Sequence, residues 1–199
     1  MDGDEVMAND LDRRAVVKAL LKDRGDLLVV TGLGSSSYDV FAAGDTEANF
    51  YLWGAMGGAA MVGLGLALAQ PKRPVAVITG DGEQLMGLGS LATSAAKRPK
   101  NLSIVVLDNA HFGETGMQMS HSGLGSKLEL IAAGAGFPSV SEIKDIDALT
   151  AFRPKLQDLN GPHFARIAIS TAHVDRALPP RDGVFLKNRF RAHLGFPPN

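Results

Sequence analysis

Three short runs of consecutive apolar residues constrain the fold of this chain more than any other feature. They are residues 27–31 (LLVVT), 75–79 (VAVIT) and 102–107 (LSIVVL), and each is rich in β-branched residues. A strand that is apolar on both faces is typical of a parallel sheet covered by helices on both sides, because neither face reaches water. We therefore expect each run to form a buried parallel strand.

Segments with helical periodicity alternate with these strands. Residues 11–22 carry one apolar face, with Asn9 or Asp10 as candidate N-cap, and residues 85–96 keep a helical period that ends before Pro99. The remaining predicted elements are a helix at 126–133, a strand at 140–143, a helix capped by Asp145 or Asp147 and ended or kinked by Pro154, and a strand at 164–169. This alternation predicts an α/β fold: a doubly wound, mainly parallel sheet of five or six strands with helices on both faces.

The uncharged segment 48–71 is the one stretch that resembles a membrane span. A spanning helix needs about 20 apolar residues, but five glycines fall within the twelve positions from Gly54 to Gly65. Asn49 and Gln70 also place polar side chains near its ends. We expect a small-residue helix that is buried against other parts of the protein, and no membrane span.

Charge and cysteine content exclude several classes of function. A net charge of -1 gives no overall field that would attract nucleic acid or an anionic membrane. The absence of cysteine rules out disulfides, thiolate metal sites and protein-ligated iron–sulfur clusters, including those of a 2-oxo acid:ferredoxin oxidoreductase subunit. Residues 1–12 show neither the basic nor the apolar region of a secretory signal. We expect a cytoplasmic protein.

Two turns carry the strongest functional signal. Ligands of open parallel sheets bind beyond the carboxyl ends of the strands. Gly80-Asp81-Gly82 follows the second apolar run and opens into a helix, so that backbone N–H groups can face an anion. Asn109 follows the next run, 28 residues after Asp81. A carboxylate and an amide oxygen at neighbouring strand ends suit Mg²⁺ bound to a diphosphate, although each turn alone is common in other settings.

This order of elements resembles the thiamine diphosphate enzymes, whose diphosphate-binding domain carries GDG and then an asparagine at a similar interval. The resemblance covers about residues 11–170 and is carried by GAMGGAAMVGLGLAL, GDGEQLMGLGSL and LDNAHFGETGMQ. Within the family, the chain looks most like the beta subunit of two-subunit sulfopyruvate decarboxylases and the matching domain of phosphonopyruvate decarboxylases. The resemblance implies a thiamine diphosphate-binding fold, with thiamine diphosphate and Mg²⁺ as cofactors.

The resemblance also assigns roles to single residues. Asp81 and Asn109 are expected to bind the metal through their side chains, and His111 through its backbone carbonyl. Gly54 would accept a hydrogen bond from the aminopyrimidine, and Met56 would support the bent cofactor, although Met56 also suits a plain core position. The complete expected cofactor site comprises Gly54, Met56, Gly80, Asp81, Gly82, Glu83, Asn109, His111 and Phe112.

Three positions depart from the family pattern. Gly58 stands where the phosphonopyruvate enzymes tend to have histidine, Glu83 follows GDG where a small residue is usual, and Asp108 replaces the first of a common asparagine pair. A carboxylate at Glu83 would repel a diphosphate if it pointed inward, so we expect it to turn away.

In the family, a glutamate that activates the cofactor comes from a separate pyrimidine-binding domain. This chain has room for one doubly wound unit, so the resemblance implies a partner subunit of similar size and a hetero-oligomer. The expected function is that of the diphosphate-binding subunit of a decarboxylase acting on a small 2-oxo acid. The alternatives are a subunit of an acetolactate synthase-like carboligase and a non-catalytic regulatory module of the same fold.

The loop at residues 112–125 follows the metal asparagine and is expected to lie over the cofactor or substrate. Gln118 and His121 are candidate catalytic residues, and Ser122 is a candidate for substrate contact or proton transfer; a mobile surface loop is the alternative. We divide the chain into a flexible acidic N-terminus (1–10), the cofactor-binding domain (11–170) and a C-terminal extension or interface arm (171–199), for which disorder is the alternative.

Overall fold

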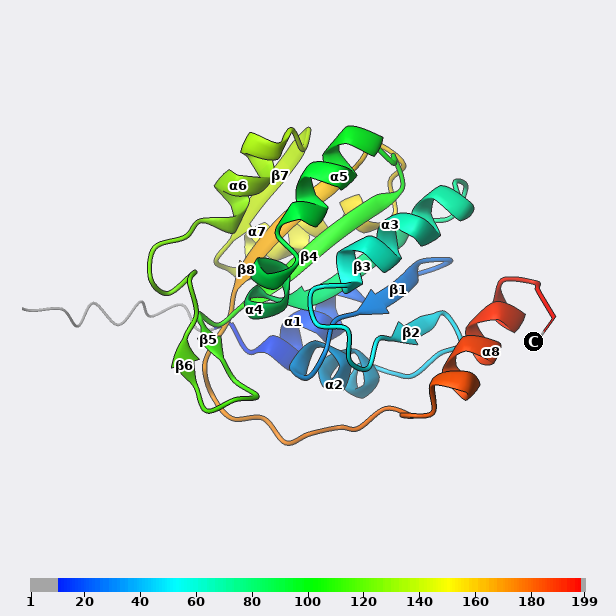
Figure 1. Cartoon of the computed structure of the whole chain (residues 1–199), viewed down its shortest axis with the longest axis horizontal. Helices are drawn as coiled ribbons and strands as arrows, with labels where there is room; N and C mark the ends of the chain where they lie inside the picture. The colour runs from blue at the N-terminus through cyan, green and yellow to red at the C-terminus, as the bar shows by residue number, and fades with distance from the viewer. Residues whose placement is uncertain (1–10, 198–199) are drawn as a thin grey trace, which may run out of the picture.

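The computed structural model describes residues 11–197 and contains a six-stranded parallel sheet between two layers of helices (Figure 1). The strands lie in the order β2-β1-β3-β4-β8-β7, and every neighbouring pair is parallel. The predicted α/β fold class is therefore confirmed, with six strands. The flexible N-terminus predicted at residues 1–10 lies outside the described residues.

The sheet strands are β1 (Leu28–Thr31), β2 (Asn49–Tyr51), β3 (Val75–Gly80), β4 (Leu102–Asp108), β7 (Ser139–Ile143) and β8 (His163–Ala168), while β5 (His111–Phe112) and β6 (Gln118–Met119) form a separate antiparallel hairpin. The helices are α1 (Arg13–Leu20), α2 (Ser35–Ala42), α3 (Ala59–Ala69), α4 (Asp81–Met86), α5 (Gly89–Lys97), α6 (Leu128–Ala135), α7 (Ile146–Phe152), the 3₁₀ helix η1 (Arg153–Leu156) and α8 (Gly183–His193). The strands predicted from the three apolar runs are all present.

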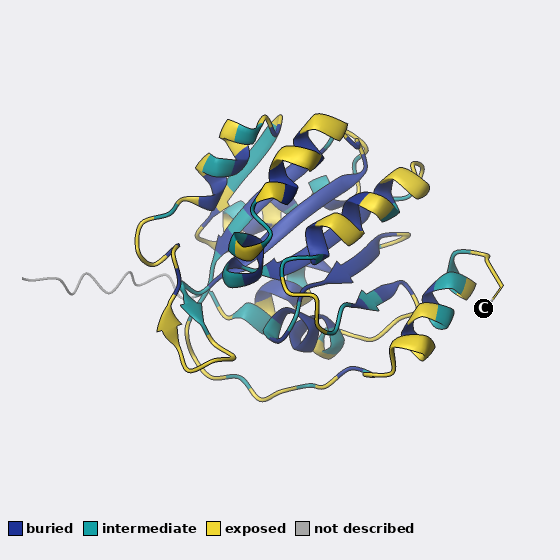
Figure 2. Cartoon of the chain, in the orientation of Figure 1, coloured by how far each residue is buried: buried dark blue, intermediate teal, exposed yellow. Residues whose placement is uncertain are grey.

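Two apolar cores lie on opposite faces of the sheet. Along β4, Val105 and Leu107 belong to the core under α1, α2 and α7, whereas Ile104 and Val106 belong to the core under α3, α5 and α6. This alternation follows from the two-residue period of a strand. Figure 2 shows the buried strands between helices whose outer surfaces are exposed. The continuous apolar runs in the sequence reflect burial on both faces.

The small-residue helix expected within residues 48–71 is present as α3, but it covers only part of the segment. The segment contains β2, a loop at residues 52–58 that we call the Met56 loop, and α3. Gly54 and Gly57 have φ values of 78° and 91°, which are incompatible with a continuous right-handed helix. Burial is also incomplete, because Leu68 on α3 is 50% exposed. Within residues 11–197, no helix is both long and apolar enough to cross a membrane.

The helix predicted over residues 85–96 is two helices, α4 and α5, which are separated at Gly87 and Leu88. A Cβ atom on Gly87 would lie 2.1 Å from the carbonyl oxygen of Gly57, so this contact excludes any side chain at position 87.

The first helix, α1, is also capped differently from the prediction. Its N-cap is Asp12, whose carboxylate accepts a hydrogen bond from the backbone N–H of Ala15 at 2.7 Å, rather than Asn9 or Asp10, which lie outside the described residues.

The C-terminal segment packs against the opposite edge of the sheet from β7. After β8 the chain runs past the hairpin and α2 to reach α8 beside β2 (Figure 1). Leu186 of α8 joins one core and Phe190 joins the other, so this helix closes the edge of the sheet. Arg189 pairs with Asp45 at 2.7 Å, and Trp53 of the Met56 loop donates a hydrogen bond to the carbonyl of Pro180 at 2.8 Å.

Candidate functional site

A pocket opens where the strand order reverses, between the carboxyl ends of β1 and β3. The chain leaves β1 toward β2 on one side and continues from β3 toward β4 on the other, which is the arrangement that creates a ligand-binding crevice in open α/β sheets. The pocket has a volume of about 180 Å³. Its walls come from the turn after β1, the Met56 loop, the start of α4 and the segment that follows β4.

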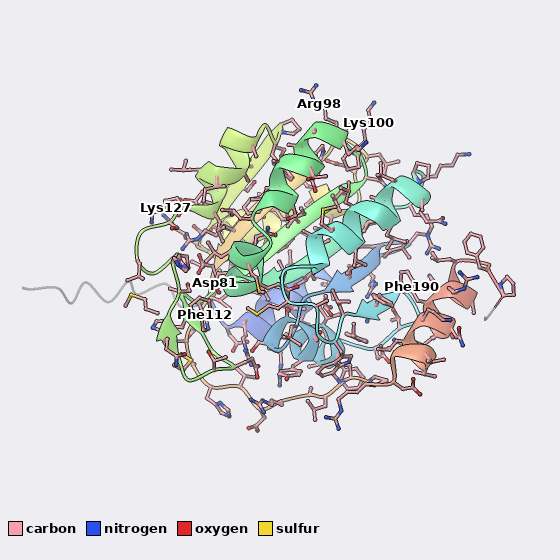
Figure 3. All side chains as sticks on the ribbon, in the orientation of Figure 1. Asp81, Arg98, Lys100, Phe112, Lys127 and Phe190 are labelled. Atoms are coloured by element: carbon pink, nitrogen blue, oxygen red, sulfur yellow. The ribbon has the colours of Figure 1, made fainter. Side chains whose placement is uncertain are left out.

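The structure brings together most of the residues expected at the cofactor site. The pocket is lined by Met56, Gly80, Asp81, Gly82, Glu83, Asn109, His111 and Phe112. Gly54 lies in the Met56 loop outside the pocket lining. Asp81 and Phe112, which come from different strand ends, lie close together in Figure 3.

Asp81 is the first residue of α4 and is almost fully buried. Its Oδ2 atom accepts hydrogen bonds from Ser120 and, at 3.1 Å, from Ser122. Burial raises the pKa of Asp81 above its ordinary value; the hydrogen bond from Ser120 opposes this change, and the neighbouring carboxylate of Asp108 adds to it. The two serines therefore hold the carboxylate in one orientation at the edge of the pocket.

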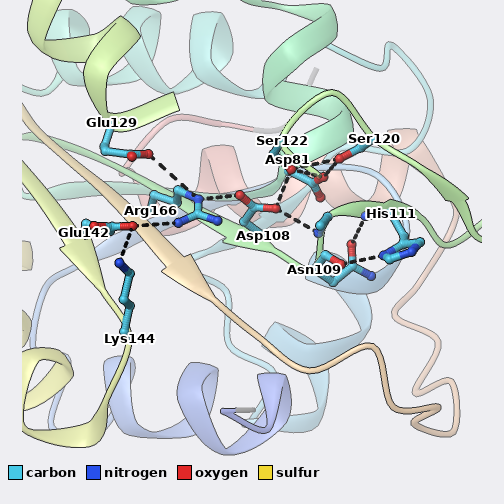
Figure 4. Close-up of polar contacts among 11 residues, drawn as sticks. Asp81, Asp108, Asn109, His111, Ser120, Ser122, Glu129, Glu142, Lys144 and Arg166 are labelled. Atoms are coloured by element: carbon cyan, nitrogen blue, oxygen red, sulfur yellow. Dashed lines mark hydrogen bonds and ion pairs between the residues drawn. The ribbon is translucent and has the colours of Figure 1, made fainter. Parts of the chain in front are cut away.

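Ser122 connects Asp81 to a second buried carboxylate. Its hydroxyl lies 2.7 Å from Asp108 Oδ1, and Asp108 Oδ2 accepts a hydrogen bond from Arg166 at 2.5 Å (Figure 4). Burial opposes the charge on Arg166, but the hydrogen bond to Asp108 and the nearby acidic side chains outweigh it and raise the pKa of the guanidinium. Ser122 thus lies within a buried network, away from the pocket lining.

Asn109 and His111 form a tight turn after β4. Asn109 Oδ1 accepts a hydrogen bond from the backbone N–H of His111 at 3.0 Å, and the intervening Ala110 has a φ of 62°. Residues 11–197 contain no group of three or more His, Cys, Asp or Glu side chains that could hold a metal. The expected set instead combines one carboxylate, one amide oxygen and one backbone carbonyl, which are hard oxygen donors suited to Mg²⁺.

Glu83 points toward backbone amides on two other segments of the chain. Its Oε2 atom accepts a hydrogen bond from the N–H of Leu33 at 2.6 Å, and its Oε1 atom from the N–H of Ala59 at 3.3 Å. Burial raises the pKa of Glu83, and these amide hydrogen bonds work in the opposite direction. The carboxylate is therefore directed to the turn after β1 and to the start of α3.

Sequence reasoning missed the turn after β1. Ser35 and Ser36, at the N-terminus of α2, line the pocket, as does Arg13, whose guanidinium lies 3.3 Å from buried Asp39. The buried hydroxyl of Ser36 has no hydrogen-bond partner among the described residues. The signal was available, because TGLGSSS is a glycine-rich turn directly after the first apolar run.

These features fit an anionic diphosphate with a bound cation. The free Ser36 hydroxyl and the N-terminal amides of α2 and α4 can donate hydrogen bonds to phosphate oxygens. A Cβ atom on Gly82 would lie 2.7 Å from the ring of Phe112, so glycine at this position lets that ring pack against the start of α4.

A second, apolar pocket of about 490 Å³ adjoins the first and shares Met56, Gly82 and Phe112 with it. His121 lines this pocket, and its ring lies edge-on to Phe112 with centroids 6.4 Å apart. Gln118 lies on exposed β6, where its side-chain amide donates to the carbonyl of Thr115 at 3.1 Å. The residues that line the two pockets include His121 but not Gln118.

Comparisons with known proteins point to one family. Residues 34–168 match the sequence profile of the thiamine pyrophosphate enzyme C-terminal TPP binding domain. The sulfopyruvate decarboxylase subunit beta of Methanothermobacter thermautotrophicus is 34% identical over 180 residues, which cover 90% of this chain and 94% of that subunit. The phosphonopyruvate decarboxylase of Streptomyces viridochromogenes is 39% identical over 176 residues, which cover 87% of this chain but 43% of that protein.

A solved structure supports the same fold. Benzoylformate decarboxylase from Polynucleobacter necessarius superposes with a TM-score of 0.68 at 18% sequence identity, covering 88% of this chain and 36% of that protein. At this identity, the likeness concerns the fold alone. The chain thus matches nearly the whole of a beta subunit and less than half of each of the two longer enzymes.

Proposed function

The chain belongs to the thiamine diphosphate enzyme family, and on this basis we propose that it is the diphosphate- and Mg²⁺-binding subunit of a decarboxylase that acts on a small 2-oxo acid. The observation that carries the proposal is the convergence of Asp81, Asn109 and His111 on one pocket at the switch point of the sheet. The family assignment rests on the profile match and on the beta subunit that this chain covers almost completely.

The pocket residues have separate tasks in this proposal. Asp81, Asn109 and the backbone carbonyl of His111 would hold Mg²⁺, and the N-termini of α2 and α4 would bind the diphosphate. Met56 and Phe112, which line both pockets, would support the rings of the cofactor. Bound thiamine diphosphate supplies the electron sink that decarboxylation requires. We further propose that His121, which lines the apolar pocket, moves a proton at the reacting carbon, while Gln118 stays a weaker candidate because its amide is engaged by Thr115.

A partner subunit of the pyrimidine-binding type would complete the site. The name of the Methanothermobacter relative identifies it as one subunit of a larger enzyme. Apolar side chains around the second pocket are open to solvent in this chain: Met56 is 40% exposed and Met86 is 68% exposed. A partner that covers these residues would exclude water from the cofactor and supply the activating glutamate.

The substrate would be sulfopyruvate- or phosphonopyruvate-like, in line with the names of the relatives. The cytoplasmic location stays a prediction.

Binding of the cofactor tests the proposal directly. The wild-type complex should bind thiamine diphosphate only in the presence of Mg²⁺, and Asp81→Ala should abolish this binding while the far-UV circular dichroism is retained. Retained metal-dependent binding in Asp81→Ala would refute the metal assignment. Absence of any binding by the wild type would instead favour the non-catalytic regulatory module.

The partner and the reaction need separate measurements. Native mass spectrometry of the tagged protein from its own cell extract should show a second chain of about 150–200 residues, the size of one domain, together with thiamine diphosphate and Mg²⁺. Product analysis with and without an acceptor 2-oxo acid would then distinguish decarboxylation from acetolactate synthase-like carboligation. An active preparation that contains this chain alone would defeat the two-subunit proposal.

A further inference from the structure

Glu83 joins three segments that are far apart in the sequence. It lies on α4, directly after the Gly80-Asp81-Gly82 turn, and the residue is only 5% exposed. One carboxylate oxygen accepts the N–H of Leu33 from the turn after β1, and the other accepts the N–H of Ala59, the first residue of α3. All three segments contribute to the wall of the pocket or adjoin a loop that does.

The surrounding backbone fits closely around this carboxylate. A Cβ atom on Gly32 would lie 2.1 Å from Glu83 Oε2, so the turn after β1 approaches the carboxylate without room for a side chain. At the other end of α4, a Cβ atom on Gly87 would lie 2.1 Å from the carbonyl oxygen of Gly57. The Met56 loop is thus held against α4 from two sides, at Gly57 and at the start of α3.

We propose that Glu83 is a positioning residue whose carboxylate ties the turn after β1 and the start of α3 to α4, and thereby fixes Leu33 and Met56 at the pocket wall. Its effect on cofactor binding rests on the function proposed above, but the tie itself does not. A small residue at this position would leave the N–H groups of Leu33 and Ala59 without these acceptors. Glu83, which departs from the family pattern, therefore does not direct its carboxylate at the diphosphate. It instead holds the segments that form the wall of the pocket.

The isosteric variant Glu83→Gln tests the tie without changing side-chain volume. An amide has one oxygen, so its NH₂ group must face either the N–H of Leu33 or the N–H of Ala59, and one hydrogen bond is lost. Trp53, the single tryptophan of the chain, lies in the Met56 loop and reports on that loop by its fluorescence. We expect the Trp53 emission of Glu83→Gln to shift to longer wavelength while the far-UV circular dichroism is unchanged. Asp147→Asn, at an exposed position of α7, is the matched control and should leave the emission unchanged.

A second variant perturbs the carboxylate without removing it. Gly32→Ala should displace Glu83 and shift the Trp53 emission in the same direction, and the change should be smaller when Gly32→Ala is introduced into Glu83→Ala. In the assembled enzyme, Glu83→Gln should weaken binding of thiamine diphosphate with Mg²⁺ by about tenfold or more, the value of a hydrogen bond to a charged group. Unchanged emission and unchanged affinity in Glu83→Gln would overturn the proposal. If the wild type fails to bind the cofactor but Glu83→Gln shifts the emission, the proposed function fails and the tie stands.

Discussion

Arg166 Nε lies 2.5 Å from Asp108 Oδ2, and this ion pair joins β4 to β8 behind the candidate metal ligand Asp81 (Figure 4). Asp108 has a side chain with no exposed surface, and that of Arg166 is 12% exposed. Two carboxylates, Asp81 and Asp108, therefore share Ser122 at a buried strand end. Position 108 is commonly asparagine in the family. The guanidinium of Arg166 neutralises the negative charge that aspartate adds at this position.

Removal of one partner of the Arg166–Asp108 ion pair should strongly destabilise the folded protein. Arg166→Met would leave Asp108 buried without its cation, and we expect the free energy of unfolding to fall by about 3–5 kcal/mol. The double variant Asp108→Asn with Arg166→Met should recover a large part of this loss. Urea denaturation measures both values. Arg153→Met, which removes an exposed ion pair with Asp23, is the control and should cost about 0–1 kcal/mol; an equal loss in both arginine variants would contradict the argument.

The fold was predictable because its central strands are buried on both faces. Each of the three apolar runs forms a strand of the sheet. Asp145, one of the two residues proposed as the N-cap of the following helix, caps α7. The predicted helix boundaries were wrong where the backbone conformation of single residues ends a helix that the composition favours. Residues 48–71 carry no charged residue, but the positive φ values of Gly54 and Gly57 prevent a continuous helix, and no periodicity in the sequence reveals such a turn.

The site was predictable where chemistry and strand order coincide. Asp81 and Asn109 follow adjacent strands and line the same pocket. Ser36 was missed although its glycine-rich turn follows an apolar run, and Arg13 was missed as well. Only the strand order, which puts β1 beside β3, indicates that the turn after β1 reaches this pocket, and no local pattern predicts that order. Ser122 was a candidate for substrate contact or proton transfer because of its place in the loop at residues 112–125, whereas its burial between Asp81 and Asp108 depends on how that loop folds back.

The glycines of α3 should differ in their tolerance of a methyl group. A Cβ atom on Gly63 would lie 2.1 Å from Val77 Cγ2 on β3, whereas nothing lies within 4 Å of such an atom on Gly65. We expect Gly63→Ala to destabilise the protein by about 1–3 kcal/mol through overpacking. Gly65→Ala should be neutral or stabilise by up to about 1 kcal/mol, because alanine favours the helix. Thermal unfolding of the two variants checks this, and equal effects would show that α3 does not pack closely on β3.

Docking of α8 should weaken in mild acid. His193 on α8 lies with Nε2 2.8 Å from the guanidinium of Arg73, and burial together with Arg73 lowers the pKa of the imidazole. The acidic groups Glu47 and Asp26 oppose this change, while Arg24 adds to it. The unfolded chain then binds the proton more readily than the folded one. The stabilising contribution is present above the unfolded pKa of about 6.5 and is lost as the pH falls toward the lower folded value.

The measurement for His193 is the thermal unfolding midpoint at pH 7.5 and pH 5.5. Other groups also titrate in this range, so the wild type is compared with His193→Gln, which keeps a polar side chain but cannot gain the charge. The wild-type midpoint should fall further on acidification than that of the variant. An identical fall in both proteins would remove His193 from the pH dependence.

Substitutions of His121 and Gln118 should have different effects on turnover, although the two residues lie only three positions apart in the sequence. His121 reaches the apolar pocket beside Phe112, whereas Gln118 is engaged with Thr115 on the outer hairpin. In the assembled enzyme at saturating cofactor, we expect His121→Ala to lower turnover by about 10²-fold, the lower range for a positioned acid or base. Gln118→Ala should change turnover less than about twofold, since its side chain makes local contacts only and surface substitutions of this kind have small effects. Steady-state assays of both variants decide the matter, because full activity in His121→Ala would mean that another group transfers the proton.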